Sequence, residues 1–312
     1  MKKNFLLKNY TTIRIGGRAK FFCIVKSKLE LVTAIEWARI QKMMWCVVGE
    51  GSNLVVSDRG YPGLIIQNEI KKFNRDGKVV TIGAGNNLFE TIFRLNRLGL
   101  AGMERMAGIP GTVGGAIYGC AGAYGQELKD ALVKVRFFDG KNFRVFTNKQ
   151  CQFGYRESIF KKRKEWTITE VELRLKPAKS SKLLAISREI INLRKKKYHP
   201  GLNCPGSFFK NVRLVDLGPV ALKKLLKKID RTEIKYGKLP TGYLLEQVGA
   251  KGMKQGSIKV AKHHANLIYN SNGGKGRDVV FLAAKLKALV KKKFGIIIEE
   301  EVQYLGFEKG TP

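Results

Sequence analysis

The sequence predicts an α+β fold with more than one domain. The chain has 312 residues, about two domains of ordinary size, and 44% of them are hydrophobic, enough to build buried cores. A strand at 21–25, a helix from Ser27 and a strand at 45–48 form a β-α-β unit near the N-terminus. Short strands and separate helices follow this unit, which is typical of an α+β protein.

The predicted helices are marked by caps as well as by apolar spacing. Ser27 and Glu30 have the spacing of a capping box. A second helix is predicted at about 88–98, because Gly99 follows it as a C-terminal cap. Further helices are predicted at about 183–197, 241–248 and 278–294, and further strands at 64–66, 79–82, 132–138, 143–146 and 166–175.

Two interruptions of these patterns indicate domain boundaries. The segment 71–77 is polar and charged, and His199-Pro200-Gly201 ends the long basic helix before it. The sequence therefore predicts domains at 1–70, 71–199 and 200–312.

Glycines are concentrated where a ligand loop would need them. The stretch 101–125 holds eight glycines in twenty-five residues, too irregular for a helix, and we expect it to be a system of functional loops. The dinucleotide fingerprint G-x-G-x-x-G and the P-loop pattern are both absent. Two turns remain, 49–53 and 108–115, and each could direct several backbone N–H groups at one anion. Two such turns suit a pyrophosphate, whereas either one alone is better explained as a structural turn.

The charge of the chain raises a competing hypothesis. Lys and Arg number 59 against 25 acidic residues, giving a net charge of +34, which is typical of proteins that bind nucleic acid or anionic membranes. No zinc spacing, RNA-binding aromatic motif or helix-turn-helix pattern accompanies the basic runs. A solvated lysine-rich surface is therefore favoured, and a basic nucleic-acid-binding protein is kept as an alternative.

Other residue types limit the location and the chemistry. The start of the chain has no secretory apolar region, and no apolar run approaches the ~18 residues of a membrane span. The five cysteines are odd in number and form no C-x-x-C pair, which favours a reducing compartment. Three histidines late in the chain do not suit a metal site. We expect a cytoplasmic protein without a metal and without membrane insertion.

Ordered sequence blocks then carry a family resemblance. They include Ala-Gly-Ile-Pro-Gly-Thr-Val-Gly-Gly at 107–115 and Gly-Ser-Phe-Phe-Lys-Asn at 206–211. The others lie at 9–17, 51–54, 121–125, 154–161, 244–247, 251–252, 264–266 and 301–302. In this order the blocks resemble the UDP-N-acetylenolpyruvoylglucosamine reductase family. The 50 residues between Arg156 and Ser207 resemble its shorter class, which lacks a tyrosine-bearing capping loop.

The resemblance implies a fold and a reaction. It implies two α/β subdomains forming a PCMH-type FAD-binding fold, followed by a C-terminal α/β substrate-binding domain. FAD is expected to be bound without a covalent bond, because the flavin loops contain no histidine. NADPH would supply hydride through FAD to the enolpyruvyl group of a UDP-sugar, giving UDP-N-acetylmuramate for peptidoglycan. The partners expected are these small molecules, with no obligatory nucleic acid and the oligomeric state left open; another PCMH-type flavin oxidoreductase is the second alternative.

The resemblance also implies three catalytic residues. Arg156 would bind the substrate carboxylate, a role that suits a guanidinium fork. Ser207 would donate a proton to the carbon next to that carboxylate, with its charge supported by Lys210, Asn211 or a relayed water. Glu301 would bond to the enediolate that develops, and Glu299 competes with it because both lie on one face of a strand. Residue type alone would instead make Arg156 a surface ion pair and Ser207 a turn or helix cap.

The remaining predicted site residues follow the same blocks. Cys120 stands where the family commonly has asparagine, and we expect a small buried thiol there. Predicted substrate contacts are Tyr124, Lys210, Asn211 and Asn266. Predicted cofactor contacts are Gly49, Gly51, Ser52, Asn53, Gly108, Ile109, Pro110, Gly111, Thr112, Gly114, Gly115, Ala121, Gly122, Ala123 and Gly125.

Overall fold

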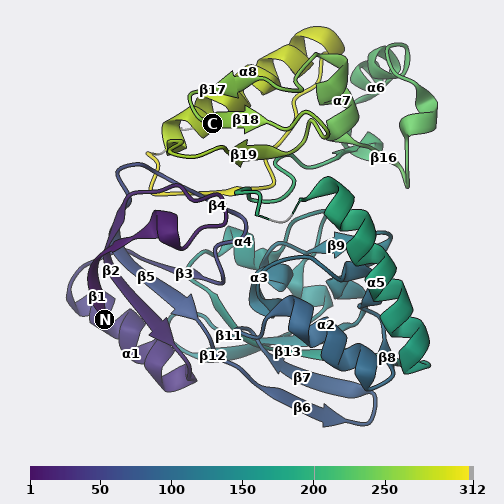
Figure 1. The fold of residues 1–312 in the computed structure, drawn as a ribbon. Coiled ribbons are helices and arrows are strands. Elements are labelled where there is room, and N and C mark those ends of the chain that lie inside the picture. The colour runs from purple at the N-terminus through teal and green to yellow at the C-terminus, as the bar shows by residue number, and fades with distance from the viewer. Residues whose placement is uncertain (200, 309–312) are drawn as a thin grey trace. The chain divides into compact units, whose positions relative to one another are not determined.

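The computed structural model describes residues 1–199 and 201–308 and divides into two compact units (Figure 1). Unit one contains Met1–Phe5, Ala19–Gly51 and Pro62–Lys196. Unit two contains Leu6–Arg18, Ser52–Tyr61 and the described residues from Lys197 onward. The predicted boundary at 70 lies inside unit one, and Pro200, part of the second predicted break, lies outside the described residues. The division into three domains therefore stays a prediction.

A four-stranded sheet with one covering helix begins unit one. Its strand order is β1 (Lys2–Leu6), β2 (Arg18–Val25), β5 (Tyr61–Asn68) and β3 (Trp45–Val48), and β3 and β5 are parallel. Helix α1 (Lys28–Ile40) packs its buried Leu31, Ile35 and Ala38 against this sheet. The backbone N–H of Glu30 donates to the Ser27 hydroxyl at 3.1 Å, so the predicted N-terminal cap is confirmed.

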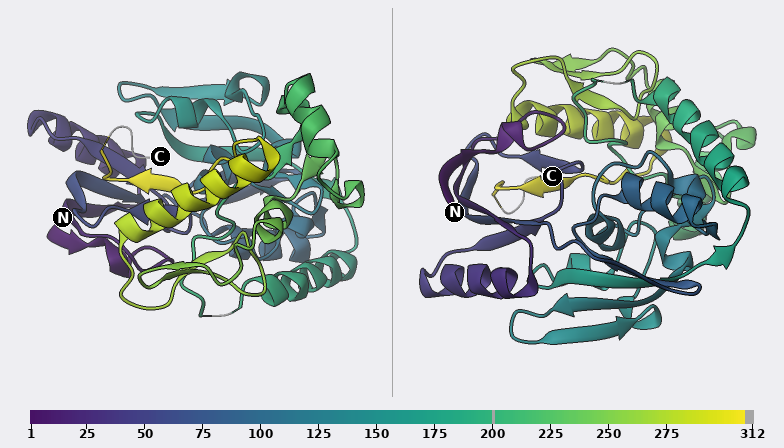
Figure 2. Two further views of the ribbon diagram at one scale, coloured as in Figure 1. Left: turned by 90° about the horizontal axis from the view of Figure 1, so that it is seen from above. Right: turned by 60° about the horizontal axis from the view of Figure 1, so that its bottom comes forward.

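A second, antiparallel sheet forms the larger part of unit one. Its order is β12 (Phe143–Thr147), β11 (Leu132–Phe138), β13 (Thr167–Arg174), β7 (Val79–Gly83) and β6 (Phe73–Asp76). Helices α2 (Leu88–Arg97) and α3 (Val113–Tyr118) cover one face of it (Figure 2). Helix α5 (Ser180–Lys197) adds Ile190 to the same core, whose strand side includes Val80, Val135 and Val171.

Helix α3 corrects one expectation, because we predicted that 101–125 is too irregular for a helix. Thr112 caps this helix, its hydroxyl accepting the N–H of Gly115 at 3.1 Å. Val113, Ala116 and Ile117 are buried on the side that faces the core. A hydroxyl cap and this buried face compensate for two glycines in a six-residue helix.

Unit two is built on a three-stranded antiparallel sheet of β17 (Lys254–Gln255), β18 (Ile258–Val260) and β19 (Ile268–Asn270). Helices α7 (Thr241–Gln247) and α8 (Gly276–Phe294) share its core through Leu244, Leu282 and Leu286. A parallel pair, β4 (Leu54–Val56) with β20 (Gln303–Leu305), joins segments from opposite ends of the chain.

Smaller elements complete the two units. They are α4 (Ile159–Lys162) and α6 (Pro219–Leu226), the strands β8 (Leu100–Ala101), β9 (Gly122–Ala123), β10 (Gln126–Glu127), β14 (Lys176–Pro177), β15 (Val212–Arg213) and β16 (Lys238–Leu239), and six 3-10 turns at Leu7–Asn9, Glu104–Met106, Leu128–Asp130, Lys149–Cys151, Leu214–Asp216 and Arg231–Glu233. The structure contains every helix and strand predicted from the sequence. They are helices α1, α2, α5, α7 and α8 and strands β2, β3, β5, β7, β11, β12 and β13.

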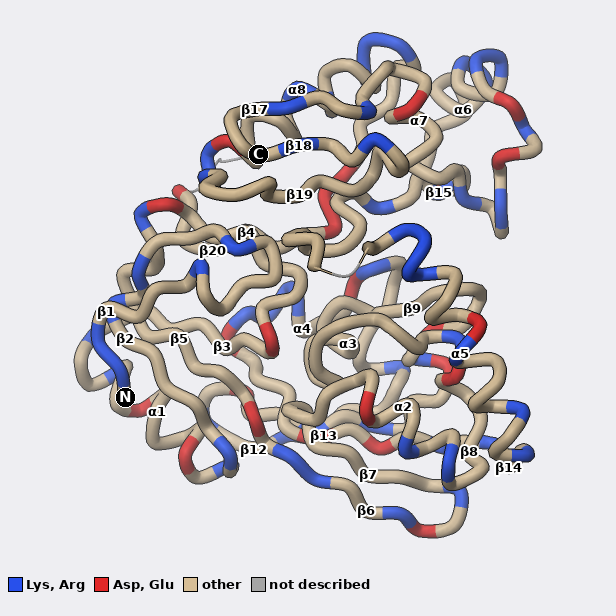
Figure 3. The backbone as a smooth tube through the Cα atoms, in the orientation of Figure 1, with Lys and Arg blue, Asp and Glu red and all other residues tan. Residues whose placement is uncertain are grey.

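The basic runs of the sequence lie on the surface (Figure 3). Lys195 and Lys196 are exposed near the end of α5, Lys223 and Lys224 on α6, and residues 291–293 at the end of α8. This exposure agrees with the predicted solvated lysine-rich surface. Among the described residues no helix is both long and apolar enough to cross a lipid bilayer.

Candidate active site

Two of the predicted glycine loops meet in unit one. A Cβ atom on Gly49 would lie 2.6 Å from the Thr112 hydroxyl oxygen, so the first loop reaches the second more closely than any side chain allows. Asn87, which pairs with Thr112 in an isolated bridge, donates its side-chain amide to the Glu50 carboxylate at 2.9 Å. The loops separated by some sixty residues in sequence are therefore neighbours, as a shared ligand requires.

The second loop is held open by contacts on both sides. Gly108 and Gly111 have φ values of 82° and 110°, in the region that favours glycine. The Arg194 guanidinium of α5 donates to the Gly108 carbonyl at 3.0 Å, and the backbone N–H of Leu88 donates to the Gly111 carbonyl at 2.9 Å. Ile109 and Pro110 lie between these two glycines; Ile109 is half-buried and Pro110 is exposed. A backbone surface with few side chains fits the close approach of an anionic group such as the pyrophosphate of FAD.

The third loop, 119–125, ends in a tight hairpin. Strands β9 and β10 pair Ala123 with Gln126, and Tyr124 and Gly125 form the two-residue turn with φ values of 50° and 79°. Positive φ at both central residues matches the twist of a hairpin. The Tyr124 side chain stands at the turn with 41% exposure, where a ligand can reach it.

Arg156 is bound to this third loop. Its guanidinium donates to the carbonyls of Cys120 at 3.3 Å and Gly122 at 2.9 Å. Arg156 itself has a φ of 59°, and the Lys161 ammonium donates to its carbonyl at 2.7 Å. The residue is thus half-buried and fixed within unit one, unlike a surface side chain.

The Cys120 thiol is buried beneath the same loop, as predicted. Burial, supported by the Glu127 carboxylate, raises the pKa of this thiol to about 11. The group therefore stays protonated and unreactive at neutral pH.

Unit two surrounds Ser207 with groups that we did not predict. The Ser207 hydroxyl lies 2.7 Å from the Tyr198 hydroxyl and accepts from the Lys197 ammonium at 3.4 Å. The expected neighbours are engaged elsewhere. The Lys210 ammonium pairs with Glu299 at 3.0 Å, and the Asn211 side-chain oxygen accepts the N–H of Thr241 at 3.3 Å.

The three consecutive glutamates, Glu299 to Glu301, lie in an extended segment in which neighbouring side chains point in different directions. The Lys210 N–H donates to the Glu299 carbonyl, and the Glu301 N–H donates to the Phe208 carbonyl, both at 2.8 Å. This pairing brings the backbone of Glu301 beside the residue that follows Ser207. Glu300 turns to α8, where its carboxylate pairs with Lys287 at 3.0 Å, whereas the Glu299 side chain is 71% exposed.

Two predicted cofactor residues also belong to unit two. The Thr12 hydroxyl donates to the Ser52 carbonyl at 3.2 Å, and the Asn53 amide donates to the Glu301 carbonyl at 3.1 Å. Asn53 therefore helps to fix the backbone of the candidate acid.

Asn266, a predicted substrate contact, bonds to the backbone of Phe209. This side chain is 3% exposed, and its amide both donates to the Phe209 carbonyl and accepts the Phe209 N–H, each at 2.8 Å. This buried amide therefore holds the backbone next to Ser207.

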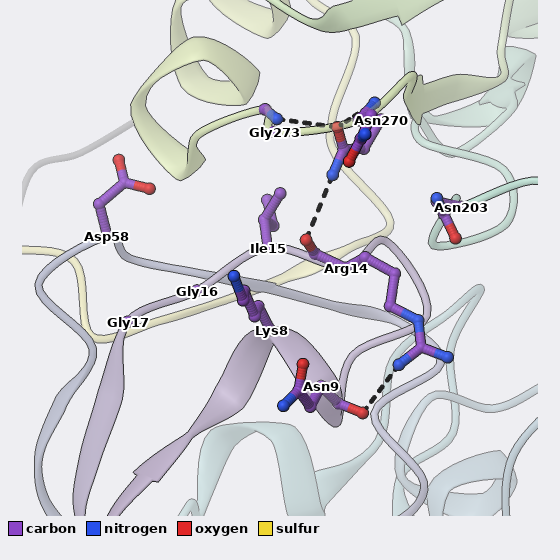
Figure 4. A pocket seen from close by; sticks show the side chains of 12 residues that line it. Lys8, Asn9, Arg14, Ile15, Gly16, Gly17, Asp58, Asn203, Asn270 and Gly273 are labelled. Atoms are coloured by element: carbon purple, nitrogen blue, oxygen red, sulfur yellow. Dashed lines mark hydrogen bonds between the residues drawn. The ribbon is translucent and has the colours of Figure 1, made fainter.

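A pocket of about 440 Å³ in unit two was missed by the sequence reasoning (Figure 4). Part of its lining comes from the block at 9–17, which we treated only as one of the motifs of the family resemblance and not as the sign of a pocket. The Asn270 amide donates to the carbonyls of Ile13 and Arg14 at 3.2 Å and so joins the block to β19. The lining residues are Lys8, Asn9, Arg14, Ile15, Gly16, Gly17, Asp58, Asn203, Asn270, Asn272, Gly273 and Gly274.

Comparison with family models gives the class of protein. A model described as an FAD binding domain matches residues 19–143, which include the first two glycine loops. A model described as the C-terminal domain of UDP-N-acetylenolpyruvoylglucosamine reductase matches residues 198–305, which include Ser207 and Glu301. The chain is therefore a flavin-dependent oxidoreductase with a PCMH-type FAD-binding fold and a separate C-terminal domain.

Individual relatives give the family. The UDP-N-acetylenolpyruvoylglucosamine reductase of Solibacter usitatus is 42% identical over 95% of this chain and 94% of its own length. That of Carboxydothermus hydrogenoformans is 34% identical over 97% of this chain and 93% of its own. A crystal structure of the Thermus caldophilus enzyme (MurB) matches 96% of this chain and 97% of its own with a TM-score of 0.75 and 30% identity. The chain belongs to the UDP-N-acetylenolpyruvoylglucosamine reductase family, which confirms the predicted resemblance, the enzyme class and FAD as cofactor.

Proposed function

We propose that the chain reduces the enolpyruvyl group of UDP-N-acetylglucosamine enolpyruvate to the lactyl group of UDP-N-acetylmuramate, in the cytoplasm, for peptidoglycan synthesis. The observation that carries this proposal is the backbone pairing of Glu301 with Phe208, because it brings the segment that carries the candidate acid beside the residue that follows Ser207. Residues 1–70 and 71–199 would form the two FAD subdomains, and 200–312 the substrate domain.

The glycine loops would hold the cofactor without a covalent bond. When bound, FAD accepts a hydride from NADPH and delivers it to the terminal carbon of the enolpyruvyl double bond. Loops 49–53 and 108–115 would contact its pyrophosphate through backbone N–H groups, and loop 121–125 would line the same site. Gly114 keeps this loop close to Ala84, because its N–H donates to the Ala84 carbonyl at 2.8 Å and an added Cβ would lie 2.8 Å from the Ala84 side chain.

Arg156 would stabilise the negative charge that develops on the substrate carboxylate. A guanidinium has five N–H groups in a planar fork. It can therefore hold the carbonyls of Cys120 and Gly122 while binding a carboxylate with the other edge of the fork. This dual role would couple the position of the third loop to the presence of substrate.

Ser207 would protonate the carbon next to the carboxylate, and Glu301 would bond to the enediolate before that proton arrives. Glu299 is the weaker candidate, because its carboxylate is exposed and paired with Lys210. Tyr124, Lys210 and Asn211 remain our proposed substrate contacts, and Asn266 is reassigned to holding the turn at Phe209.

The substitution Ser207→Ala tests this assignment. Flavin reduction by NADPH should stay near the wild-type rate, because Ser207 has no part in that step. Re-oxidation by the enolpyruvyl substrate should slow by roughly a hundredfold or more, as loss of a positioned acid does. Stopped-flow absorbance of the flavin separates the two steps, and Ser257→Ala in the turn after β17 is the matched control. Equal slowing of both steps would remove Ser207 from its role.

A further inference from the structure

The hydroxyl of Ser207 lies in a small polar cluster formed by residues that directly precede its loop. Tyr198 Oη is 2.7 Å from Ser207 Oγ, and Lys197 Nζ is 3.4 Å from the same atom. The Lys197 ammonium also lies 5.1 Å from the centre of the Tyr198 ring. All three residues belong to unit two, so the cluster is a property of that unit alone.

The backbone of this cluster is held by histidines. A ring nitrogen of His263 bonds to the Lys197 carbonyl at 2.9 Å, and the His199 ring packs against His263 with centroids 4.6 Å apart. These contacts fix the chain on both sides of Tyr198. The tyrosine hydroxyl is therefore positioned by neighbours that are not part of the candidate catalytic set.

Hydrogen-bond counting shows how the cluster orients Ser207. A serine hydroxyl has one proton to donate and two lone pairs that accept. A lysine ammonium can only donate, so Lys197 occupies one lone pair. If Tyr198 donates to the other, the single Ser207 proton must point away from both, toward whatever lies in the site. Ser207 needs this orientation to protonate a carbon.

The charge around the cluster favours loss of a proton from the serine. Lys197 is a cation 3.4 Å from the Ser207 hydroxyl, and the charges of Lys197 and Lys251 both act on the nearby His264. Burial, together with these cations, lowers the pKa of His264 to about 3, so this imidazole is neutral at physiological pH. An alkoxide formed at Ser207 would thus be stabilised by an ammonium and by a tyrosine proton.

We propose that Tyr198 is a positioning residue that orients the Ser207 hydroxyl and returns a proton to it after each turnover. The proposal rests on the role of Ser207 given above. The Ser207 O–H bond breaks as a C–H bond forms at the substrate carbon, which already carries the electron pair left by hydride addition. The Tyr198 O–H bond then breaks as the Ser207 O–H bond re-forms, and a hydronium ion from bulk solvent returns a proton to Tyr198 and leaves water, while Lys197 balances the charge in between.

The substitution Tyr198→Phe tests the proposal by removing one oxygen atom and keeping the ring. Flavin content and flavin reduction by NADPH should match wild type. Re-oxidation by the enolpyruvyl substrate should slow about tenfold to a hundredfold, the range of a lost proton-transfer partner. Its solvent deuterium isotope effect should increase, because proton transfer then limits the step more strongly. Tyr236→Phe makes the same change at a tyrosine that is 87% exposed and serves as the matched control.

A second measurement does not depend on turnover. In protein labelled with 3-fluorotyrosine, the ¹⁹F resonance that disappears in Tyr198→Phe belongs to Tyr198. Ser207→Ala should shift that resonance, since it removes the hydrogen-bond partner of the hydroxyl. Lys197→Met should slow re-oxidation and Lys197→Arg should restore part of the rate, because arginine keeps a cationic donor.

The outcomes separate this proposal from the proposed function. Re-oxidation within twofold of wild type in Tyr198→Phe, or slower re-oxidation with an unchanged isotope effect, would overturn the positioning role. If Ser207→Ala slows re-oxidation in the same experiment, only the inference about Tyr198 fails. If Ser207→Ala has no effect either, the assignment of Ser207 itself is wrong.

Discussion

Three residues of the candidate site have positive φ angles, a backbone conformation that residues other than glycine rarely adopt. Cys120, Tyr124 and Arg156 have φ values of 43°, 50° and 59°. Such residues cost on the order of 1 kcal/mol each and cluster where the surrounding structure fixes a functional geometry. The bonds from Arg156 to the third loop hold two of these positions together. Sequence propensity carries no sign of this strain, so Arg156 could be found only through its motif.

The neighbours of Ser207 show the same limit of sequence reasoning. We expected support from Lys210 and Asn211 because they are close in the chain. In the structure the Ser207 hydroxyl contacts Lys197 and Tyr198, which precede the turn in the chain. The Ser207 turn can pack against the residues that precede it or against those that follow it. Tertiary contacts, such as that of His263 with the Lys197 carbonyl, decide which of the two it contacts.

His264 gives unit two a pH-dependent stability. Burial lowers the pKa of this imidazole from 6.5 to about 3, so the unfolded chain binds a proton in this window that the folded chain does not. The free energy of unfolding should therefore fall as pH decreases from 6.5 toward 3, and the contribution should be fully present above 6.5. In His264→Gln this part of the pH dependence should be absent. Urea unfolding of both proteins at pH 4, 5 and 7.5 measures it, and parallel curves for the two would contradict the prediction.

At the scale of elements, caps and apolar periodicity were sufficient to predict five of the helices. Helices α1, α2, α5, α7 and α8 were predicted because each repeats apolar residues over two or more turns. The short strands β17, β18 and β19 have two or three residues each, too few to show a period of two. Helix α6 was missed although Pro219 stands in its first turn, where proline is typical of a helix start.

Helix α3 allows a test of how closely the glycine loop is packed. In Gly114→Ala the added Cβ would lie 2.8 Å from the Ala84 side chain and 3.1 Å from its carbonyl oxygen. The free energy of unfolding should fall by about 1–3 kcal/mol, as overpacking does, and the flavin should bind more weakly. Thermal or chemical unfolding and flavin release measure the two effects.

Gly115→Ala, the adjacent position in the same helix, is the matched control for stability. Its Cβ would meet nothing closer than the Thr112 hydroxyl at 3.4 Å. Alanine should be neutral or stabilising there by up to ~1 kcal/mol. Equal losses of stability at both positions would show that the helix, and not the contact with Ala84, is sensitive.

At the scale of the whole molecule, the charge of +34 has a kinetic consequence. NADPH and the UDP-sugar are both polyanions, and lysines and arginines are distributed along the backbone of both units (Figure 3). A positive field speeds the capture of anions, and salt screens it over about 10 Å at 0.1 M. The kcat/KM for each substrate should fall several-fold as ionic strength rises, whereas kcat should change little. Steady-state kinetics from low salt to about 0.5 M measures this, and flat kcat/KM values would show that the charge has no role in capture.

The sequence could predict the family and the order of the domains along the chain. It could not predict that short segments of the N-terminal region belong to unit two. Residues 6–18 and 52–61 belong to unit two, although we placed them in the first FAD subdomain. Short segments of this kind join a distant core through a few buried side chains, here Ile13, Ile15 and Val55. Nothing local distinguishes these residues from the core of the domain that surrounds them in sequence.

The pairing of β20 with β4 determines when unit two can be completed during protein synthesis. Tyr304 lies opposite Val55, which is fully buried. On the ribosome, β4 emerges long before β20 has been translated. The edge of β4 that pairs with β20 therefore has no strand partner for most of elongation. The nascent chain therefore cannot complete this pair until residues 303–305 have been translated, and a stop codon just before Gln303 would leave β4 without this partner.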